Sequence, residues 1–106
     1  MKRLLFICSR NQLRSPTAEA VFSGRAGIEV DSAGLDHDAV IPLSPEQVKW
    51  ANLIFVMENT HASKLRRKFK RDLNGQCVIV LRIPDDYSYM SPALVALLER
   101  KVTPFL

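Results

Sequence analysis

A cysteine and an arginine six residues apart are the side chains of this sequence best suited to covalent chemistry. Cys8 follows the apolar run Leu4–Ile7, and Arg14 precedes Ser15–Phe22, a segment with the pattern of a helix. A thiolate is a strong nucleophile, and a guanidinium binds phosphate oxygens in a planar, bidentate arrangement. A loop that leads into a helix also offers backbone N–H groups to an anion. The spacing therefore predicts a phosphate-binding loop with Cys8 as nucleophile and Arg14 as phosphate clamp.

These groups suit attack on a phosphate ester. The Cys8 thiolate displaces the alcohol, and water then hydrolyses the phosphocysteine. Arg14 and the loop N–H groups stabilise the charge on the phosphoryl oxygens. We assign Ser15 to hydrogen bonding with the thiolate, or alternatively to capping the helix. The remaining loop residues are assigned to substrate binding, with Asn11 suited to positive φ or to an ordinary turn: Ser9, Arg10, Asn11, Gln12 and Leu13.

The elements that must position this loop alternate along the chain. Continuous apolar runs predict strands at 4–7, 28–30, 53–57 and 77–81. Amphipathic segments with N-terminal Ser-Pro or Gly end signals predict helices at 15–22, 44–50, 60–71 and 91–100. This order predicts an α/β three-layer sandwich over residues 1–106, a single phosphatase-like domain whose four-stranded parallel sheet carries helices on both faces.

Two adjacent carboxyl groups are candidates for the general acid that the leaving group needs. Asp85 and Asp86 lie in Ile83–Tyr89, directly after the last predicted strand. The carboxyl ends of parallel strands meet at one edge of a sheet, so this segment emerges beside Cys8. A solvated Pro-Asp-Asp turn is the alternative interpretation.

The sequence resembles the low-molecular-weight protein tyrosine phosphatases. The similarity covers residues 4–34 and 52–70. It is carried by Cys8, Arg14-Ser15-Pro16, Ala18-Glu19-Ala20, Phe22, Asp31-Ser32-Ala33-Gly34 (the family's stretch after its second strand) and Ile54-Phe55-Val56-Met57-Glu58.

The resemblance implies a phosphatase for phosphorylated protein, most of all protein phosphotyrosine, or for small aryl phosphates, in which Ser32 braces the loop. In the family's Asp-Pro-aromatic segment, Asp85 matches the general acid, Tyr87 matches an aromatic beside the substrate ring, and Asp86 replaces the proline.

The chain also departs from the family pattern. Leu13 stands where a second loop cysteine is common, and Arg10 replaces a glycine. The chain is shorter than the usual member, and Leu35–Leu43 stands where a helix and longer loops are expected, so one wall of the pocket is expected to be rebuilt or missing.

Two further functions stay open at this point. An arsenate reductase would use the same loop but would need an external thiol, because Cys77 is predicted to be buried in a strand. A non-catalytic phosphate- or phosphoprotein-binding module would keep the loop without its acid.

The positive charge is concentrated in one segment. The chain has fifteen basic and eleven acidic side chains, a net charge of +4. Six of the basic ones fall in Lys64–Arg71, so the rest carries nine minus eleven, or −2. We predict a solvated helix face, or alternatively a docking surface for an acidic or phosphorylated partner. Nucleic acid is the less favoured partner because no aromatic residues interleave with the charges.

Composition excludes several other classes of protein. With 106 residues, 47% of them hydrophobic, the chain is an ordinary globular one and has no apolar run of membrane-spanning length. Only four apolar residues follow Met1-Lys2-Arg3, so we expect no signal peptide and, with two cysteines, a reducing cytoplasmic location. His37 and His61 are predicted to be surface residues without metal-ligand spacing. The sequence implies no metal or organic cofactor and leaves the oligomeric state open.

Overall fold

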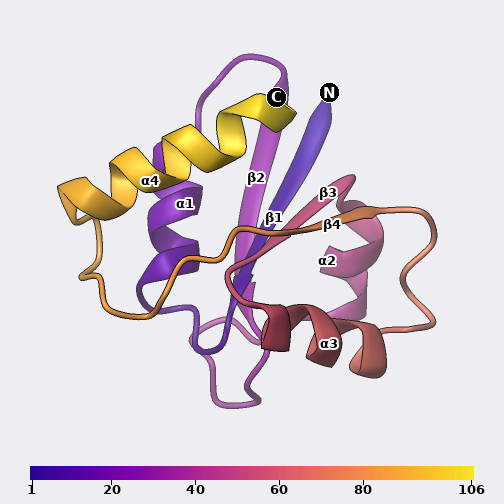
Figure 1. Cartoon of the computed structure of the whole chain (residues 1–106). Coiled ribbons are helices and arrows are strands. Elements are labelled where there is room, and N and C mark those ends of the chain that lie inside the picture. Colours follow the sequence, from indigo (N-terminus) through magenta and orange to yellow (C-terminus); the bar gives the residue numbers. More distant parts are fainter.

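The computed structural model describes residues 1–106 and contains a four-stranded, all-parallel sheet in the order β2-β1-β3-β4 (Figure 1). Its strands are β1 (Lys2–Cys8), β2 (Ile28–Gly34), β3 (Leu53–Val56) and β4 (Cys77–Val80). The helices are α1 (Arg14–Phe22), α2 (Pro45–Trp50), α3 (Asn59–Lys68) and α4 (Pro92–Val102), followed by the short 3-10 helix η1 (Thr103–Phe105). The predicted three-layer α/β architecture is confirmed.

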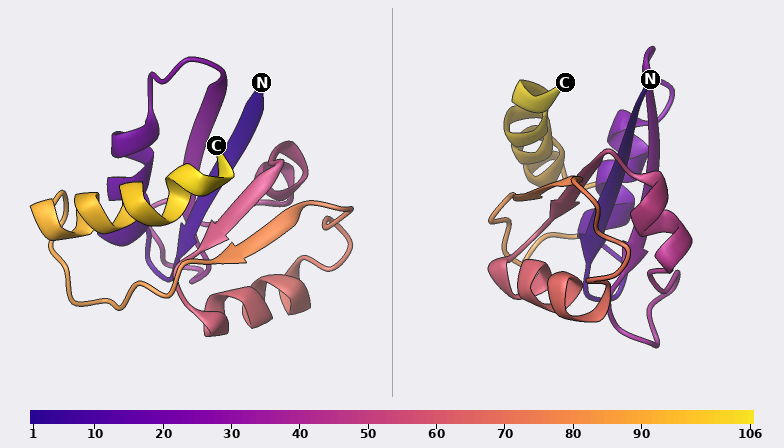
Figure 2. Two further views of the ribbon diagram at one scale, coloured as in Figure 1. Left: turned by 45° about the horizontal axis from the view of Figure 1, so that its top comes forward. Right: turned by 90° about the vertical axis from the view of Figure 1, so that its right-hand side faces the viewer.

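Alternating side chains of the central strand β1 build a core on each face of the sheet. Leu4 and Phe6 pack with residues of α1 and α4, whereas Leu5 and Ile7 pack with residues of α2 and α3. The two pairs of helices cover opposite faces of the sheet (Figures 1 and 2). All four side chains are completely buried. Burial of each such side chain contributes roughly 1.5–3 kcal/mol to the free energy of unfolding. Burial on both faces therefore fixes the position and direction of β1 within the sheet. The strand therefore delivers Cys8 to a defined point at the carboxyl edge of the sheet.

Serine-proline pairs in the sequence predict the N-terminal ends of three helices, and the serine is the N-cap residue in two of them. Ser44 caps α2 in a capping box with Gln47, and the Ser91 hydroxyl caps α4 by accepting from the Leu94 N–H. The prediction that Ser15 caps α1 is wrong, because this helix begins at Arg14 with Leu13 at the N-cap position. The Ser15 hydroxyl is instead bonded to Cys8 and Asn11.

The second strand is longer than its apolar residues predict. β2 pairs with β1 from Ile28 to Gly34, so Asp31–Gly34 belongs to the strand and does not follow it. Its polar side chains have partners on the neighbouring helices: Asp31 accepts from Gln47 of α2, and Ser32 donates to Glu19 of α1. Polar residues inside this strand are satisfied by hydrogen bonds, which is why an apolar pattern missed them.

The basic helix α3 is shorter than predicted. It ends at Lys68 and not at Arg71, because Phe69 leaves the helical conformation and packs against the core on the α2–α3 face of the sheet. Arg66, Arg67 and Lys68 occupy its last turn, where cations interact favourably with the helix dipole.

Cys77 is exposed, so the prediction that it belongs to the core is wrong. It opens the edge strand β4, which has neighbours on one side only. Through β3 it aligns with Leu4 of β1, four residues before Cys8. At about 3.3 Å per residue and 4.8 Å per strand, the two cysteines are roughly 16 Å apart. Disulfide formation needs Cα atoms within about 7 Å, so Cys77 does not reach Cys8.

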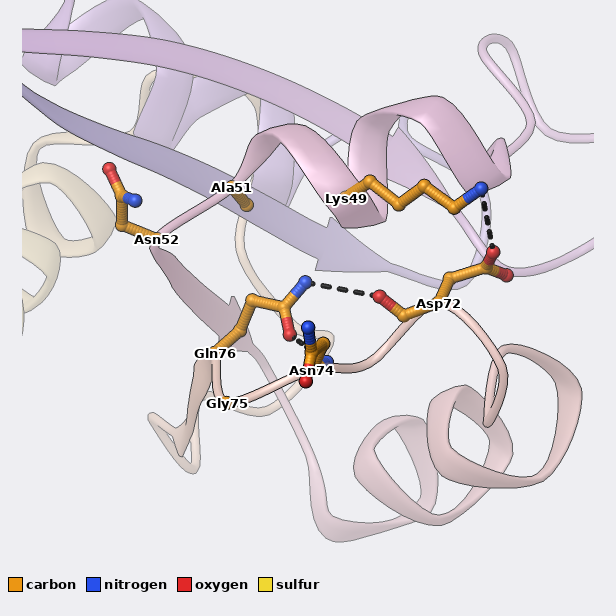
Figure 3. Close-up of a pocket in the computed structure, with 7 residues that line it drawn as sticks. All are labelled: Lys49, Ala51, Asn52, Asp72, Asn74, Gly75 and Gln76. Carbon is orange, nitrogen blue, oxygen red and sulfur yellow. Dashed lines mark hydrogen bonds and ion pairs between the residues drawn. The ribbon is translucent and has the colours of Figure 1, made fainter.

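A polar cavity of about 450 Å³ lies at the amino-terminal edge of the sheet, opposite Cys8 (Figure 3). Its side chains hold the fold together. Gln76 donates to the backbone carbonyls of Val48 and Asp72, and Lys49 pairs with Asp72 across 3.6 Å. These contacts tie the entry of β4 to α2.

Cys8 lies at the other edge of the sheet, where the strands end. The connection that leaves β1 runs to β2 on one side, whereas the connection that leaves its neighbour β3 runs to β4 on the other side. Ligands of open α/β sheets gather at such a switch point, outside the carboxyl ends of the strands. Cys8 ends β1 there, and Glu58 follows β3. None of the helices is long and apolar enough to cross a membrane.

Candidate active site

The loop after β1 turns its backbone N–H groups inward. The carbonyls of Cys8, Ser9 and Arg10 accept hydrogen bonds from N–H groups of the 35–40 segment, at 2.9–3.0 Å. In a trans peptide the N–H points opposite to the carbonyl, so the next three N–H groups face the inside of the loop. Asn11, at φ 57°, supplies the left-handed residue that this curvature needs. The result is a concave ring of donors, as an anion site requires.

Most of these donors have no protein partner. The N–H groups of Ser9, Arg10, Gln12 and Leu13 donate to no group of the protein. The structure thus brings the predicted loop residues together around a concave set of N–H groups without protein acceptors.

The sulfur of Cys8 receives two hydrogen bonds from this loop. The Asn11 N–H donates to it at 3.2 Å, and the Ser15 hydroxyl lies 2.9 Å away. Ser15, which is assigned from the sequence to hydrogen bonding with the thiolate, thus lies in contact with the sulfur.

A directed chain of hydrogen bonds orients these donors. Ser32 donates its proton to the Glu19 carboxylate, so its oxygen can only accept from the Asn11 side-chain amide, at 3.0 Å. The same amide donates to Ser15 at 2.9 Å, which leaves the Ser15 proton for Cys8. The bracing role that the resemblance implied for Ser32 thus has a physical basis.

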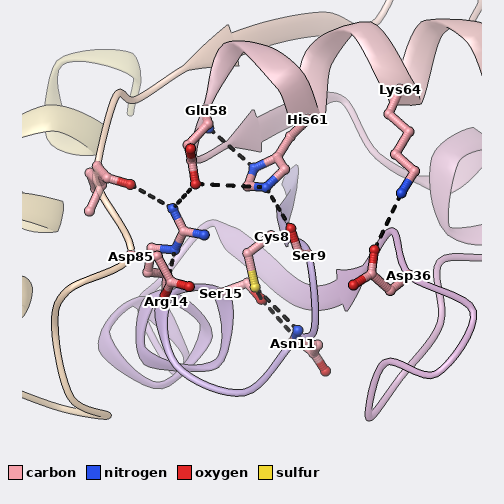
Figure 4. A network of polar contacts seen from close by, with 11 residues as sticks. Cys8, Ser9, Asn11, Arg14, Ser15, Asp36, Glu58, His61, Lys64 and Asp85 are labelled. Carbon is pink, nitrogen blue, oxygen red and sulfur yellow. Dashed lines mark hydrogen bonds and ion pairs between the residues drawn. The ribbon is translucent and has the colours of Figure 1, made fainter.

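The Arg14 guanidinium is buried and held by carboxylates on both sides (Figure 4). Its Nη1 donates to Glu58 Oε2 at 2.6 Å and to the Ile83 carbonyl at 2.7 Å, and its Nε lies 3.6 Å from Asp85 Oδ1. The hydrogen bond from Arg14 lowers the pKa of Glu58, so this carboxylate stays ionised. Nη2 has no partner within the protein and remains free for a ligand oxygen.

The prediction that His61 is a surface residue is wrong. Only 4% of it is exposed. Its Nδ1 accepts from the Glu58 N–H at 3.2 Å, so its single proton resides on Nε2, which lies 3.0 Å from the Ser9 hydroxyl. Burial, followed by the Arg14 charge, lowers the pKa of His61 and keeps it neutral. The Ser9 oxygen accepts from this Nε2, and the hydroxyl proton is left free to donate into the cavity.

This burial predicts a pH-dependent stability. Because the pKa of His61 is lowered on folding, the unfolded chain binds a proton near pH 6.5 before the folded chain does, and stability decreases as the pH falls below that value. From pH 7 to 5.5, the unfolding free energy of the wild type should fall more steeply than that of His61→Gln, by at most about 1.4 kcal/mol per pH unit. Urea titrations at several pH values measure this difference. Parallel curves for the two proteins would contradict it.

A cavity of about 320 Å³ lies over the sulfur. Asp85 lies at its mouth, with 62% of its side chain exposed, whereas Asp86 and the half-buried Tyr87 are not part of the wall. Tyr87 packs instead against the α1–α4 core. The structure thus brings Asp85 together with the loop and leaves Asp86 and Tyr87 outside. The wall is formed by Cys8, Ser9, Arg10, Gln12, Leu13, Arg14, Asp36 and Asp85.

The Leu35–Leu43 segment rebuilds one wall of this cavity. It runs against the loop through the backbone hydrogen bonds described above, and Asp36 enters the lining. Gly34 permits the approach, since a Cβ there would lie 2.6 Å from the Ser9 carbonyl oxygen. A short irregular segment therefore stands where the resemblance led us to expect a longer structure.

Sequence reasoning missed three residues of the site: Glu58, His61 and Asp36. Glu58 directly follows a buried strand, and placing β3 beside β1 would have indicated it. His61 follows three residues later on the same helix face, a weaker signal. The position of Asp36 depends on the path of a loop that no local pattern predicts. No three His, Cys, Asp or Glu side chains converge as a metal ion would require.

Comparison with known proteins places this geometry in a structural context. No family model and no curated protein sequence matches the chain. Solved structures match over nearly all of it. A low-molecular-weight protein tyrosine phosphatase from Streptococcus pyogenes gives a TM-score of 0.80 at 13% identity, covering 100% of this chain and 94% of that one. The corresponding enzyme from T. tengcongensis gives 0.79 at 20% identity, covering 100% of both.

A phosphatase with a different substrate matches as well. The YwlE arginine phosphatase from Geobacillus stearothermophilus gives a TM-score of 0.76 at 21% identity, covering 99% of this chain and 93% of that one. The likeness to these phosphatases therefore extends over nearly the whole chain. The chain has the fold of the low-molecular-weight protein tyrosine phosphatases.

Proposed function

We propose that this protein is a cysteine-dependent phosphomonoesterase that acts through a phosphocysteine. The observation that carries the proposal is a sulfur with two hydrogen-bond donors at the floor of a ring of unpaired N–H groups, with Arg14 and Asp85 in the same cavity. Phosphate is tetrahedral and doubly charged, so a ring of donors and a guanidinium fit its three non-bridging oxygens. The shared fold of known phosphatases supports the same assignment.

The first step transfers the phosphoryl group to the enzyme. The Cys8 thiolate attacks phosphorus, a sulfur–phosphorus bond forms, and the bond from phosphorus to the leaving oxygen breaks. Protonated Asp85 donates its proton to that oxygen as it leaves as the alcohol. The loop N–H groups and Arg14 Nη2 stabilise the charge on the equatorial oxygens.

The second step releases phosphate. Asp85, now a carboxylate, takes a proton from water as the water oxygen attacks phosphorus. The sulfur–phosphorus bond breaks, inorganic phosphate forms, and the hydrogen bonds from Ser15 and Asn11 stabilise the returning thiolate.

Ser9 adds a side-chain donor to the ring. Because His61 donates to its oxygen, the Ser9 proton is available to a phosphate oxygen. Hydrogen bonds to charged groups contribute about 1.5–3 kcal/mol, so Ser9→Ala should lower kcat/KM and weaken competitive inhibition by inorganic phosphate by about tenfold. Ser9→Thr keeps the hydroxyl and should retain most of both. If inorganic phosphate inhibited the wild type and Ser9→Ala equally strongly, Ser9 would not be a donor to the phosphate.

Phosphotyrosine is the substrate that we propose for the cavity. The general acid at the mouth suits an aryl oxygen that leaves as a phenol, and the phosphatases of tyrosine phosphate share the fold. An arsenate reductase is the weaker alternative because it would depend on an external thiol, since Cys77 lies at the opposite edge of the sheet and cannot act as the resolving thiol. A non-catalytic binding module is disfavoured because Asp85 is in the cavity wall.

Hydrolysis of p-nitrophenyl phosphate at mildly acidic pH in the presence of EDTA tests the proposal. We expect turnover that EDTA does not affect and that vanadate inhibits. A folded protein that binds vanadate without turnover would support the binding module instead. Peptides with phosphotyrosine and with phosphoarginine then decide the substrate, and a preference for phosphoarginine would correct the proposed specificity.

A further inference from the structure

A row of cations leads away from the cavity along α3. Asp36 in the cavity wall lies between two of them: Arg10 at 4.0 Å and Lys64 at 3.3 Å. Lys64 also belongs to α3, so the helix begins its basic face at the rim of the cavity (Figure 4). We call Arg10, Lys64, Arg67 and Lys68 the α3 track.

Helical spacing extends the track beyond the rim. Arg67 and Lys68 lie three and four residues after Lys64, so their side chains share its face of the helix. Lys64 and Arg67 line a shallow hollow of about 460 Å³ together with polar side chains of the first turns: Asn59, Thr60 and Ser63. The track is therefore a polar, basic surface that is joined to the cavity wall through the ion pair of Lys64 with Asp36.

The charges of the track are largely uncompensated. Arg67 and Lys68 are exposed and form no ion pair, and neither do Arg66, Lys70 and Arg71 beside them. No acidic residue occurs between Glu58 and Asp72. Asp36 is matched by two cations, and Asp72 is already paired with Lys49. Such a concentration of one sign attracts an oppositely charged partner and raises its association rate.

We infer that the α3 track binds acidic residues of a phosphorylated polypeptide whose phosphate occupies the Cys8 loop. This inference rests on the proposed function and adds the class of substrate to it. One helical turn spans 5.4 Å, and an extended peptide advances about 3.3 Å per residue. The helical turn from Lys64 to Arg67 therefore corresponds to about two residues of an extended peptide, and the acidic residues are those that flank the phosphorylated residue on the side of α3.

A polypeptide fits this surface better than a nucleic acid does. Binding of single-stranded nucleic acid draws on exposed aromatic side chains on which bases stack. The exposed residues of α3 are polar or basic, and the neighbouring Phe69 packs against the core.

Two matched phosphopeptides test the inference. They share a central phosphorylated residue, and one carries Asp or Glu at the flanking positions where the other carries Ser or Gln. For the wild type at low salt we expect kcat/KM to be about five- to tenfold higher for the acidic peptide, with the preference disappearing at high salt. Arg67→Glu should abolish the preference. Arg100→Glu, the same change at an exposed site of α4 on the other face of the sheet, should keep it.

The outcomes separate this inference from the proposed function. If the wild type turned over both peptides at equal kcat/KM, the inference that the α3 track binds acidic residues would be contradicted. The proposed phosphatase activity would be unaffected by this result. No turnover of either peptide or of p-nitrophenyl phosphate would overturn the phosphatase itself. Stronger inhibition by an oligoribonucleotide than by an unphosphorylated acidic peptide of equal charge would reassign the track to nucleic acid.

Discussion

Replacing Cys8 with serine is expected to reduce phosphate-ester hydrolysis by at least about 10⁴-fold. A serine hydroxyl remains protonated where a thiol ionises, and the donors around Cys8 stabilise a thiolate but contain no base to deprotonate an alcohol. Loss of a nucleophile that acts as part of a unit typically removes most of kcat. Steady-state hydrolysis of p-nitrophenyl phosphate with purified variant protein measures the loss.

Binding should survive this substitution. The loop N–H groups and Arg14 are unchanged, so the Cys8→Ser variant should still bind inorganic phosphate and be stabilised by it against thermal unfolding. Cys77→Ser provides the matched control, because this exposed thiol at the far edge of the sheet should be dispensable for turnover. A Cys8→Ser variant with a tenth of wild-type activity would exclude Cys8 as the nucleophile.

Replacing Asp85 with asparagine is expected to have the second largest effect, a loss in kcat of about 10²–10³-fold on phosphotyrosine. Positioned acids contribute roughly 10²–10⁴-fold, and the tyrosine oxygen is a basic leaving group that needs a proton. The loss should be smaller on p-nitrophenyl phosphate, because nitrophenolate is a weaker base and leaves more readily without protonation. The ratio of the two losses identifies an acid rather than a binding residue.

Asp86→Asn is the control for this prediction. The neighbouring carboxylate is exposed and outside the cavity wall, so its removal should change kcat by less than about twofold on either substrate. A larger loss in Asp86→Asn than in Asp85→Asn would move the acid by one residue. Equal small losses in both would mean that the leaving group receives its proton from elsewhere.

The two predictions share a physical basis in Arg14. Its guanidinium bonds to Glu58 at 2.6 Å, and Asp85 lies 3.6 Å away on the other side. The buried arginine thus has a fixed position between the loop and the acid. Glu58 contacts Arg14 but is not part of the cavity wall, so in the proposed mechanism its role is to position Arg14.

The sequence was sufficient for the sheet and for the reactive loop. Buried parallel strands are continuous apolar runs, and three of the four were identified to within a residue or two of their ends. The loop from Cys8 to Ser15 follows from its place between a strand and a helix. Asp85 follows from the rule that the carboxyl ends of parallel strands share one edge.

The remaining features depend on tertiary contacts that local patterns do not encode. The charged residues around His61 predict an exposed side chain. Its ring is buried because both of its nitrogens form hydrogen bonds, one with the Glu58 N–H and one with the Ser9 hydroxyl. The apolar run that follows Cys77 predicts a buried residue, but Cys77 is the first residue of an edge strand and is exposed. The polar end of β2 was missed because its partners lie on two helices distant in sequence.

Direct detection of the phosphocysteine tests the central claim most closely. Wild-type protein is mixed with a saturating aryl phosphate, denatured within milliseconds at neutral pH and digested, and the phosphorylated peptide is located by mass spectrometry. We predict one phosphoryl group on the sulfur of Cys8 and none in the Cys8→Ala variant. Full turnover with no phosphoryl group on Cys8, or with the group on another residue, would contradict the proposed chemistry.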